Sequence, residues 1–170
     1  AYVVSIFENG AFGHGAVSVI QTQSKQVVAT IVVGDNATAA AISPSGGELY
    51  VLNQTSNSIS VIDTSSNAVT ASIGVGAGTD LVVDPNGERL FVATLGGIAV
   101  ISTSERAVTA NLPVSGIPQG IAVSPDGRYV YVTEYVSLTN GNVSVISTQT
   151  GAVTANIAMG PNVYGVVAGV

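Results

Sequence analysis

Residues 107–135, AVTANLPVSGIPQGIAVSPDGRYVYVTEY, contain the pattern from which the fold of this chain can be predicted. They hold three short segments rich in β-branched and aromatic residues, and turns containing Pro or Gly separate these segments. Each segment alternates with a period of two residues, which is typical of strands rather than helices. The stretch carries almost no charge. Strands that lack a polar face are expected where a sheet is buried on both sides.

Nearly the same segments recur along the whole chain with a period of roughly 40 residues, and four strands fit each period. The recurring segments are YVVSIF at 2, YVLNQ at 50, FVATL at 91 and YVTEY at 131; VSVIQT at 17, ISVIDT at 59, IAVIST at 98 and VSVIST at 143; VVATI at 27, AVTASI at 68, AVTANL at 107 and AVTANI at 152. The turns SPSG at 43, DPNG at 84 and SPDG at 124 separate the units. This pattern predicts an all-β fold, a β-propeller of four-stranded antiparallel blades.

We name the strands of a blade A, B, C and D, represented by GIAVS, RYVYVT, NVSVIS and AVTANI. The chain then holds four blades' worth of sequence in one propeller domain or propeller segment, residues 1–170. One blade is split between the two ends of the chain. The predicted blades are residues 1–34 with 162–170, 35–74, 75–115 and 116–160.

The composition restricts the classes of function. Charged residues make up 8% of the chain and the net charge is −6, so no basic stripe is available for a nucleic-acid backbone. The absence of Cys excludes disulfides and thiol chemistry. No apolar run approaches the length of a membrane helix, and no signal peptide is visible. Because the first residue is Ala1, we expect the numbering to start at a mature or trimmed terminus.

The segments SPDGRYVYVTE and NVSVISTQTGAVTANI resemble the YVTN-type β-propeller repeat of prokaryotic cell-surface and surface-layer proteins. The resemblance covers essentially the whole chain and implies an extracytoplasmic location, secreted or at the cell surface. The chain departs from the family in two respects. The naming tetrapeptide is altered to YVLN, FVAT and YVTE, and the family usually closes with about seven blades.

The two ends of the chain have complementary strand order. The chain begins on a B strand and finishes on the A-like segment NVYGVVAGV, residues 162–170. An unpaired apolar edge is a liability, so we expect this segment to pair with AYVVSIF, either within one chain or between two. Three alternatives stay open: a four-bladed ring, half of an eight-bladed ring, or a piece of a longer propeller.

The B–C and D–A connections of a propeller emerge on one face, and here the B–C connections vary in length. The first blade inserts ENGAFGHGA and the fourth inserts EYVSLTNGN. Such variation on one face is how repeat proteins build a binding surface, although drift in surface loops produces it too. The ligand-binding candidates are Glu8, Asn9, Phe12, His14, Glu134, Tyr135 and Asn140 from B–C, and Asp35, Asp80, Gln119, Asn162 and Tyr164 from D–A.

Catalytic and metal-binding patterns are weak. His14 is the only histidine, and no G-x-S-x-G segment accompanies it, so we assign no catalytic residue. Asp35, Asp80 and Asp84 are the carboxylates we consider for calcium, but turn capping is the favoured explanation for them. We predict no cofactor and no metal.

Three N-x-[ST] sequons, at Asn36, Asn53 and Asn142, map to the B–C and D–A face and are glycosylation candidates if the protein is exported in a glycosylating organism. The alternative explanation is that Asn, Ser and Thr are common in such loops.

The sequence as a whole favours a non-enzymatic extracytoplasmic propeller module that acts as a cell-surface, surface-layer or adhesive scaffold. One alternative is a propeller enzyme of the lactonase or dehydrogenase kind with a site in the central channel. Another is a building block of an extracellular filament. The expected partners are other copies of the chain or further blades, and a cell-surface glycan or protein; neither nucleic acid nor a membrane span is expected.

Overall fold

The computed structural model describes residues 1–7, 13–161 and 163–169. These residues form β-strands joined by turns, and they include no helix that could serve as a membrane span. The strands are β1 (Tyr2–Phe7), β2 (His14–Gln21), β3 (Gln26–Asp35), β4 (Ala37–Ile42), β5 (Glu48–Asn53), β6 (Ser58–Asp63), β7 (Ala68–Gly74), β8 (Gly78–Val83), β9 (Arg89–Thr94), β10 (Gly97–Ser102), β11 (Ala107–Leu112), β12 (Ile117–Val123), β13 (Tyr129–Ser137), β14 (Asn140–Ser147) and β15 (Val153–Met159).

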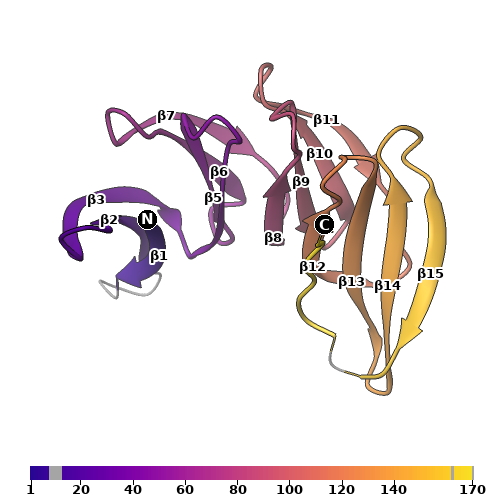
Figure 1. Ribbon diagram of the computed structural model, residues 1–170. Helices are drawn as coiled ribbons and strands as arrows, with labels where there is room; N and C mark the ends of the chain where they lie inside the picture. Colours follow the sequence, from indigo (N-terminus) through magenta and orange to yellow (C-terminus); the bar gives the residue numbers. More distant parts are fainter. Residues whose placement is uncertain (8–12, 162, 170) are drawn as a thin grey trace. The chain divides into compact units, whose positions relative to one another are not determined.

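The strands form antiparallel sheets in which neighbours in sequence are neighbours in space (Figure 1). The chain divides into two compact units, Ala1–Ala77 and Gly78–Val170. Unit 1 contains the three-stranded sheet β1–β2–β3 and the four-stranded sheet β4–β5–β6–β7. Unit 2 contains the sheets β8–β9–β10–β11 and β12–β13–β14–β15. The predicted all-β architecture of four-stranded antiparallel sheets is confirmed, and each complete sheet follows the order A, B, C, D.

Each unit has its own apolar core between its two sheets. The sheets are buried because strands B and C carry apolar side chains on both faces, as their sequences predicted. The core of unit 1 is formed by Val17, Ile31, Ala37, Leu49, Val51 and Ile62. The core of unit 2 is formed by Phe91, Ala93, Ile98, Val100, Ile121, Val130, Val132 and Ile146.

The A–B turns have the chemistry that their sequences predicted. The side chain of the first turn residue accepts the N–H of the residue five positions on, from Glu48 to Ser43 Oγ and from Tyr129 to Ser124 Oγ, both 3.0 Å. The fourth turn residue is always a glycine with positive φ, for example 75° at Gly46. A side chain is strained in this conformation, which explains the recurring glycine.

The B–C insertion of the fourth blade is a strand extension and not the loop that we expected. β13 continues to Ser137, β14 starts at Asn140, and Tyr135 pairs with Gly141 in register. The alternating residues of EYVSLTN allow the hairpin ladder to continue, although their Asn and Gly content suggested a loop.

The C-terminal segment also differs from expectation. Residues 163–169 form no strand, and β1 pairs only with β2 among the described residues. The segment lies in unit 2, where the backbone oxygen of Tyr164 accepts a hydrogen bond from Thr133 Oγ1 at 3.1 Å. The expected pairing with residues 1–7 therefore stays a prediction.

Candidate functional site

The end of each sheet that carries the B–C and D–A connections is called the loop end here, and the opposite end the turn end. At the loop end of unit 1, His14 begins β2 and Asp35 ends β3, so the two residues are cross-strand partners. Their side chains form a pair, with Nδ1 of His14 at 2.8 Å from Oδ1 of Asp35. The pair is at the surface, since the His14 side chain is 64% exposed and that of Asp35 is 35% exposed.

Two side chains from the β5–β6 turn complete this cluster. The backbone N–H of Asp35 donates to Ser56 Oγ at 2.7 Å. Asn36 has a positive φ of 54°, which Asn tolerates better than most residues, and its Nδ2 donates to Gln54 Oε1 at 2.9 Å. The loop-end cluster of His14, Asp35, Asn36, Gln54 and Ser56 therefore joins both sheets of unit 1. Sequence reasoning missed Gln54 and Ser56, because turn residues this polar are common in surface loops.

The loop-end cluster has the groups of a hydrolase triad but not its arrangement. In a triad, the hydroxyl bonds to the ring nitrogen of His that faces away from the carboxylate. Here the Ser56 hydroxyl accepts the backbone N–H of Asp35 instead. The cluster contains imidazole, carboxylate, amide and hydroxyl groups, which together can donate and accept hydrogen bonds.

In unit 2, Asp80 connects two sheets through hydrogen bonds to backbone N–H groups. Its Oδ1 accepts the N–H of Leu81 at 2.9 Å and its Oδ2 accepts that of Ile121, in β12, at 3.1 Å. Burial raises the pKa of the Asp80 carboxyl above its usual value, while these two donors act in the opposite direction. The carboxylate therefore holds β8 and β12 together.

Glu134 was expected in an exposed loop, and this was wrong. Glu134 lies in β13 as the fourth residue of the YVTE segment, and its side chain is fully buried. The side chain points toward the D–A connection, which covers it. Its Oε2 accepts the N–H of Gly116 at 2.6 Å and the hydroxyl of Ser115 at 2.9 Å. Its Oε1 has no partner among the described residues.

The remaining loop-end candidates that the structure describes all belong to unit 2. Gln119 bonds to the backbone oxygens of Ile117 and Pro118, Tyr135 is half-buried in β13, Asn140 is exposed, and the Tyr164 side chain is exposed at the C-terminal segment. Glu8, Asn9, Phe12 and Asn162 lie outside the described residues.

One of the three sequons is unsuitable in the folded chain. Asn53 is fully buried and its Nδ2 donates to Ser60 Oγ at 2.9 Å, so the amide is inaccessible to a glycosyl transferase. The burial of Asn53 follows from its position in the strand, because Asn53 occupies the same repeat position as Glu134, which is also buried. The amides of Asn36 and Asn142 bond to Gln54 and Asn156, respectively.

Asp84 is not available to calcium, because it forms a buried ion pair. Its Oδ2 is 3.0 Å from Nε of Arg89, and its side chain is almost fully buried. Among the described residues, no three His, Asp or Glu side chains gather closely enough to hold a metal ion.

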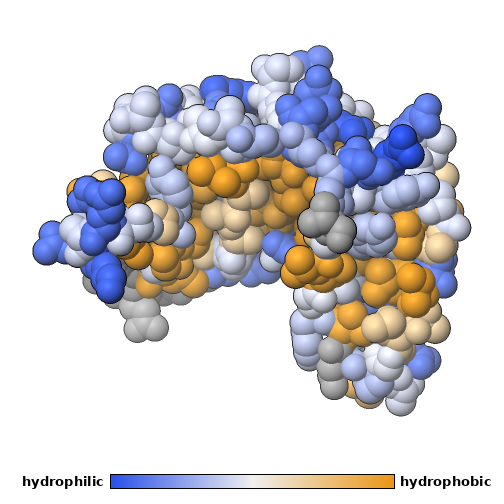
Figure 2. All heavy atoms as spheres, in the orientation of Figure 1, coloured by the Kyte–Doolittle hydropathy of each residue, from blue (hydrophilic) through white to orange (hydrophobic). Residues whose placement is uncertain are grey.

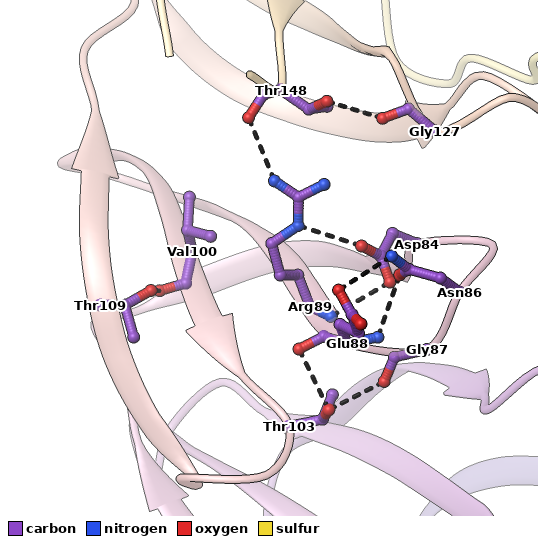
Figure 3. A network of polar contacts seen from close by, with 10 residues as sticks. All are labelled: Asp84, Asn86, Gly87, Glu88, Arg89, Val100, Thr103, Thr109, Gly127 and Thr148. Atoms are coloured by element: carbon purple, nitrogen blue, oxygen red, sulfur yellow. Dashed lines mark hydrogen bonds and ion pairs between the residues drawn. The ribbon is translucent and has the colours of Figure 1, made fainter. Parts of the chain in front are cut away.

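The Arg89 network at the turn end of unit 2 was not anticipated (Figure 3). Arg89 Nη1 donates to the backbone oxygen of Thr148, 59 residues away in sequence, at 3.1 Å, and its guanidinium lies 5.3 Å from the centre of the Phe91 ring. These residues line a pocket of about 310 Å³ together with the β14–β15 turn. The pocket follows from sheet packing, so no linear motif could reveal it.

Comparison with known proteins supports the fold. No protein-family model and no curated protein matches the chain. Kuenenia stuttgartiensis hydrazine synthase is similar in structure, with a TM-score of 0.82 and 25% sequence identity over 92% of this chain and 48% of that chain. The β-propeller domain of Myceliophteria thermophila Cps50 (Swd1) has a TM-score of 0.72 and 12% identity over 95% of this chain and 57% of that one.

This chain therefore spans about half the length of the solved structures that it matches. The likeness confirms the predicted β-propeller architecture. The YVTN-type resemblance continues to rest on the repeated segments alone.

Proposed function

We propose that the chain is a non-enzymatic, extracytoplasmic β-propeller scaffold whose loop end in unit 1 binds a hydroxyl-rich ligand, a cell-surface glycan. The observation that carries the proposal is the exposed loop-end cluster, in which His14 and Asp35 present a fixed imidazole–carboxylate pair. The YVTN-type resemblance supports a location at the cell surface or in a surface layer.

The chemistry of the cluster suits a neutral sugar. Adjacent sugar hydroxyls each donate and accept, and the cluster offers a carboxylate, an imidazole and amide groups within one surface. The backbone N–H of Asp35 donates to Ser56 and the side chain of Asn36 donates to Gln54, and both bonds keep these groups in place before a ligand binds. Preorganisation of this kind lowers the entropic cost of binding.

A glycan array followed by calorimetry tests the proposal. Replacing His14 by Ala or Asp35 by Asn should weaken binding about tenfold or more, because each removes hydrogen bonds to the ligand. Ser104→Ala, an exposed change at the turn end of unit 2, is the control and should bind normally. Equal binding by all variants, or no glycan bound by the parent chain, contradicts the proposal. Recovery of the native protein only from cytosol contradicts its location.

An enzyme is the second candidate, because one structural neighbour is named hydrazine synthase. Asp80 and Glu134 already accept backbone N–H groups in sheet packing, which leaves them poorly suited to proton transfer. Turnover of a lactone or an alcohol by the parent chain that is lost in Asp80→Asn or Glu134→Gln, with the fold intact, would favour the enzyme over the scaffold.

A further inference from the structure

Each blade sheet has two apolar faces that carry different residues. Side chains alternate along a strand, so Val130 and Val132 lie on one face of β13 and Tyr131 and Thr133 on the other. We call the face with Tyr131, Thr133, Val143, Val145 and Ile157 the aromatic face of β12–β15. We call the face with Val130, Val132 and Ile146 its aliphatic face. The repeat places corresponding residues in the other sheets.

Both units use the same rule of packing. In unit 2, the aromatic-face residues Phe91, Ala93, Ile98 and Val100 of β8–β11 pack against the aliphatic face of β12–β15. In unit 1, the aromatic-face residues Tyr2, Val4, Val17, Val19 and Ile31 of β1–β3 pack against Leu49, Val51 and Ile62 of β4–β7. The aromatic face of one sheet therefore receives the aliphatic face of the sheet that follows it.

The aromatic face of β12–β15 is only partly covered in this chain. Ile157 is 49% exposed, whereas its counterpart in unit 1, Ile31, is 7% exposed. Tyr131 is half-buried, whereas its counterpart Phe91 is fully buried. Figure 2 shows apolar side chains at the surface of this sheet. The face offers no charged side chain among the five that define it.

The covered part of that face is occupied by residues 163–169, beside β12 (Figure 1). A Cβ added at Gly120 would lie 2.5 Å from the Tyr164 oxygen, so the segment runs directly over β12. Gly120 is the repeat counterpart of Asp80, whose carboxylate bonds to Ile121 of the following A strand. Residues 163–169 therefore occupy the place of the next sheet's A strand, and the places of strands B, C and D stay open.

The sheet β1–β2–β3 has the strands and the face that would fill these open places. It consists of strands B, C and D, and no A strand pairs with β1 among the described residues. Its aliphatic face is exposed: Val3 is 47% exposed and Ile20 is half-buried. The counterparts of Val3 in the second sheet of each unit, Val51 and Val132, are fully buried.

We propose that the aromatic face of β12–β15, together with residues 163–169, binds the β1–β2–β3 sheet of a second copy of this chain. Residues 163–169 then serve as the A strand of that sheet and pair with the free edge of β1. Two copies make this contact twice in a two-fold symmetric dimer, and both exposed faces become buried.

A second copy is favoured because it offers the complementary face. In both units an aromatic face receives the aliphatic face of another sheet. The β1–β2–β3 sheet of a second copy presents such an aliphatic face, and its β1 pairs only with β2 among the described residues. The interface also continues a contact that residues 163–169 have already begun.

The test is the mass of the 170-residue chain in solution, with paired charge variants. The chain of 16.9 kDa should sediment at twice that mass, with dissociation on dilution. Val3→Lys and Val145→Glu each place one charge in an apolar contact and should give monomers with unchanged β-sheet circular dichroism. Mixing these two variants should restore the dimer, because one of its two interfaces is then unmodified and the other pairs Lys with Glu.

Val69→Lys and Val108→Glu are the matched controls, because valines at this repeat position are exposed in every sheet. Both controls should remain dimeric. A monomeric parent chain would overturn the proposal in favour of closure within one chain or of further blades that cover the two faces. An open-ended mass would overturn it in favour of a filament. A dimer that persists in Val3→Lys would show that another surface forms the contact.

Discussion

At the scale of the residue, the exposed turn at residues 63–67 sets the acid behaviour of one carboxylate. Asp63 Oδ1 accepts the hydroxyl and backbone N–H of both Ser65 and Ser66. These donors, the Ser65 hydroxyl foremost, lower the pKa of Asp63 from 3.8 to about 2. Because the folded-state pKa is the lower one, the stabilisation is fully present above pH 3.8 and is lost as the pH falls through about 2.

We expect the double variant Ser65→Ala, Ser66→Ala to move the pKa of Asp63 upward toward 3.8, since both hydroxyl donors are gone. Carboxyl chemical shifts followed by NMR between pH 1.5 and about 6 measure this change. Asp126 is the internal control, because the Ser124 hydroxyl in another turn is the main cause of its lowered pKa. A titration of Asp63 unchanged by the substitutions would contradict the assigned donors.

Arg89 stabilises unit 2 through contacts that no local pattern predicted. Arg89→Met leaves the buried Asp84 carboxylate without its charged partner and removes the bond to Thr148. We expect a loss of about 2–4 kcal/mol, less than for a fully buried pair because Arg89 is one-third exposed. Urea unfolding measures it.

The equivalent turn of the following blade suggests a control for the Arg89→Met variant. Asp84 and Arg89 correspond to Ser124 and Tyr129 in the following blade, where the same turn forms with no charged side chain at these two positions. The double variant Asp84→Ser, Arg89→Tyr should therefore regain most of the lost stability. If it is as unstable as Arg89→Met, the unpaired carboxylate is not the cause.

At the scale of the element, the C–D turns place one residue in the left-handed region. This residue is Gly151 in the last turn, and it is Lys25 in the first, with a φ of 57°. A side chain costs about 1 kcal/mol or more there, partly offset by the greater freedom of glycine in the unfolded chain. Lys25→Gly should therefore raise the unfolding free energy by up to about 1 kcal/mol in urea, whereas Gln23→Gly in the same turn should lower it.

The sequence predicted elements well wherever strand periodicity and turn chemistry agreed. The A–B turns and strands B and C followed directly from their residues. The prediction was wrong at Glu134 and Tyr135, because Asn and Gly in the insertion suggested a loop while alternation continued the hairpin. The loop-end cluster could be anticipated only in part, since the contacts of Gln54 and Ser56 depend on how two sheets pack.

At the scale of the whole molecule, the repeat predicts which face of a sheet meets which, but periodicity alone does not give the number of blades in a ring. Equivalent residues such as Phe91 and Tyr131 have the same character whether or not a sheet covers them. Only the exposure of these side chains distinguishes the covered face from the open one, and exposure is known only from the three-dimensional structure. The structure therefore identifies which faces are open, and the sequence repeat indicates that these faces are complementary.

Residues 163–169 contribute to the stability of unit 2, because they cover part of the aromatic face of β12–β15. Truncation after residue 161 would uncover Gly120 and Thr133 and remove Val163 and Val166, which are partly buried. At about 1.5–3 kcal/mol for each fully buried valine, partial burial predicts a loss of about 2–4 kcal/mol. The control is Leu138→Ser, since Leu138 is 86% exposed between β13 and β14 and its loss should leave the melting temperature nearly unchanged. If two chains pair as proposed, the truncated chain should also be monomeric, because β1 of the partner then lacks an A strand. A truncated chain that melts like the parent would show that the segment does not contribute to the packing of unit 2.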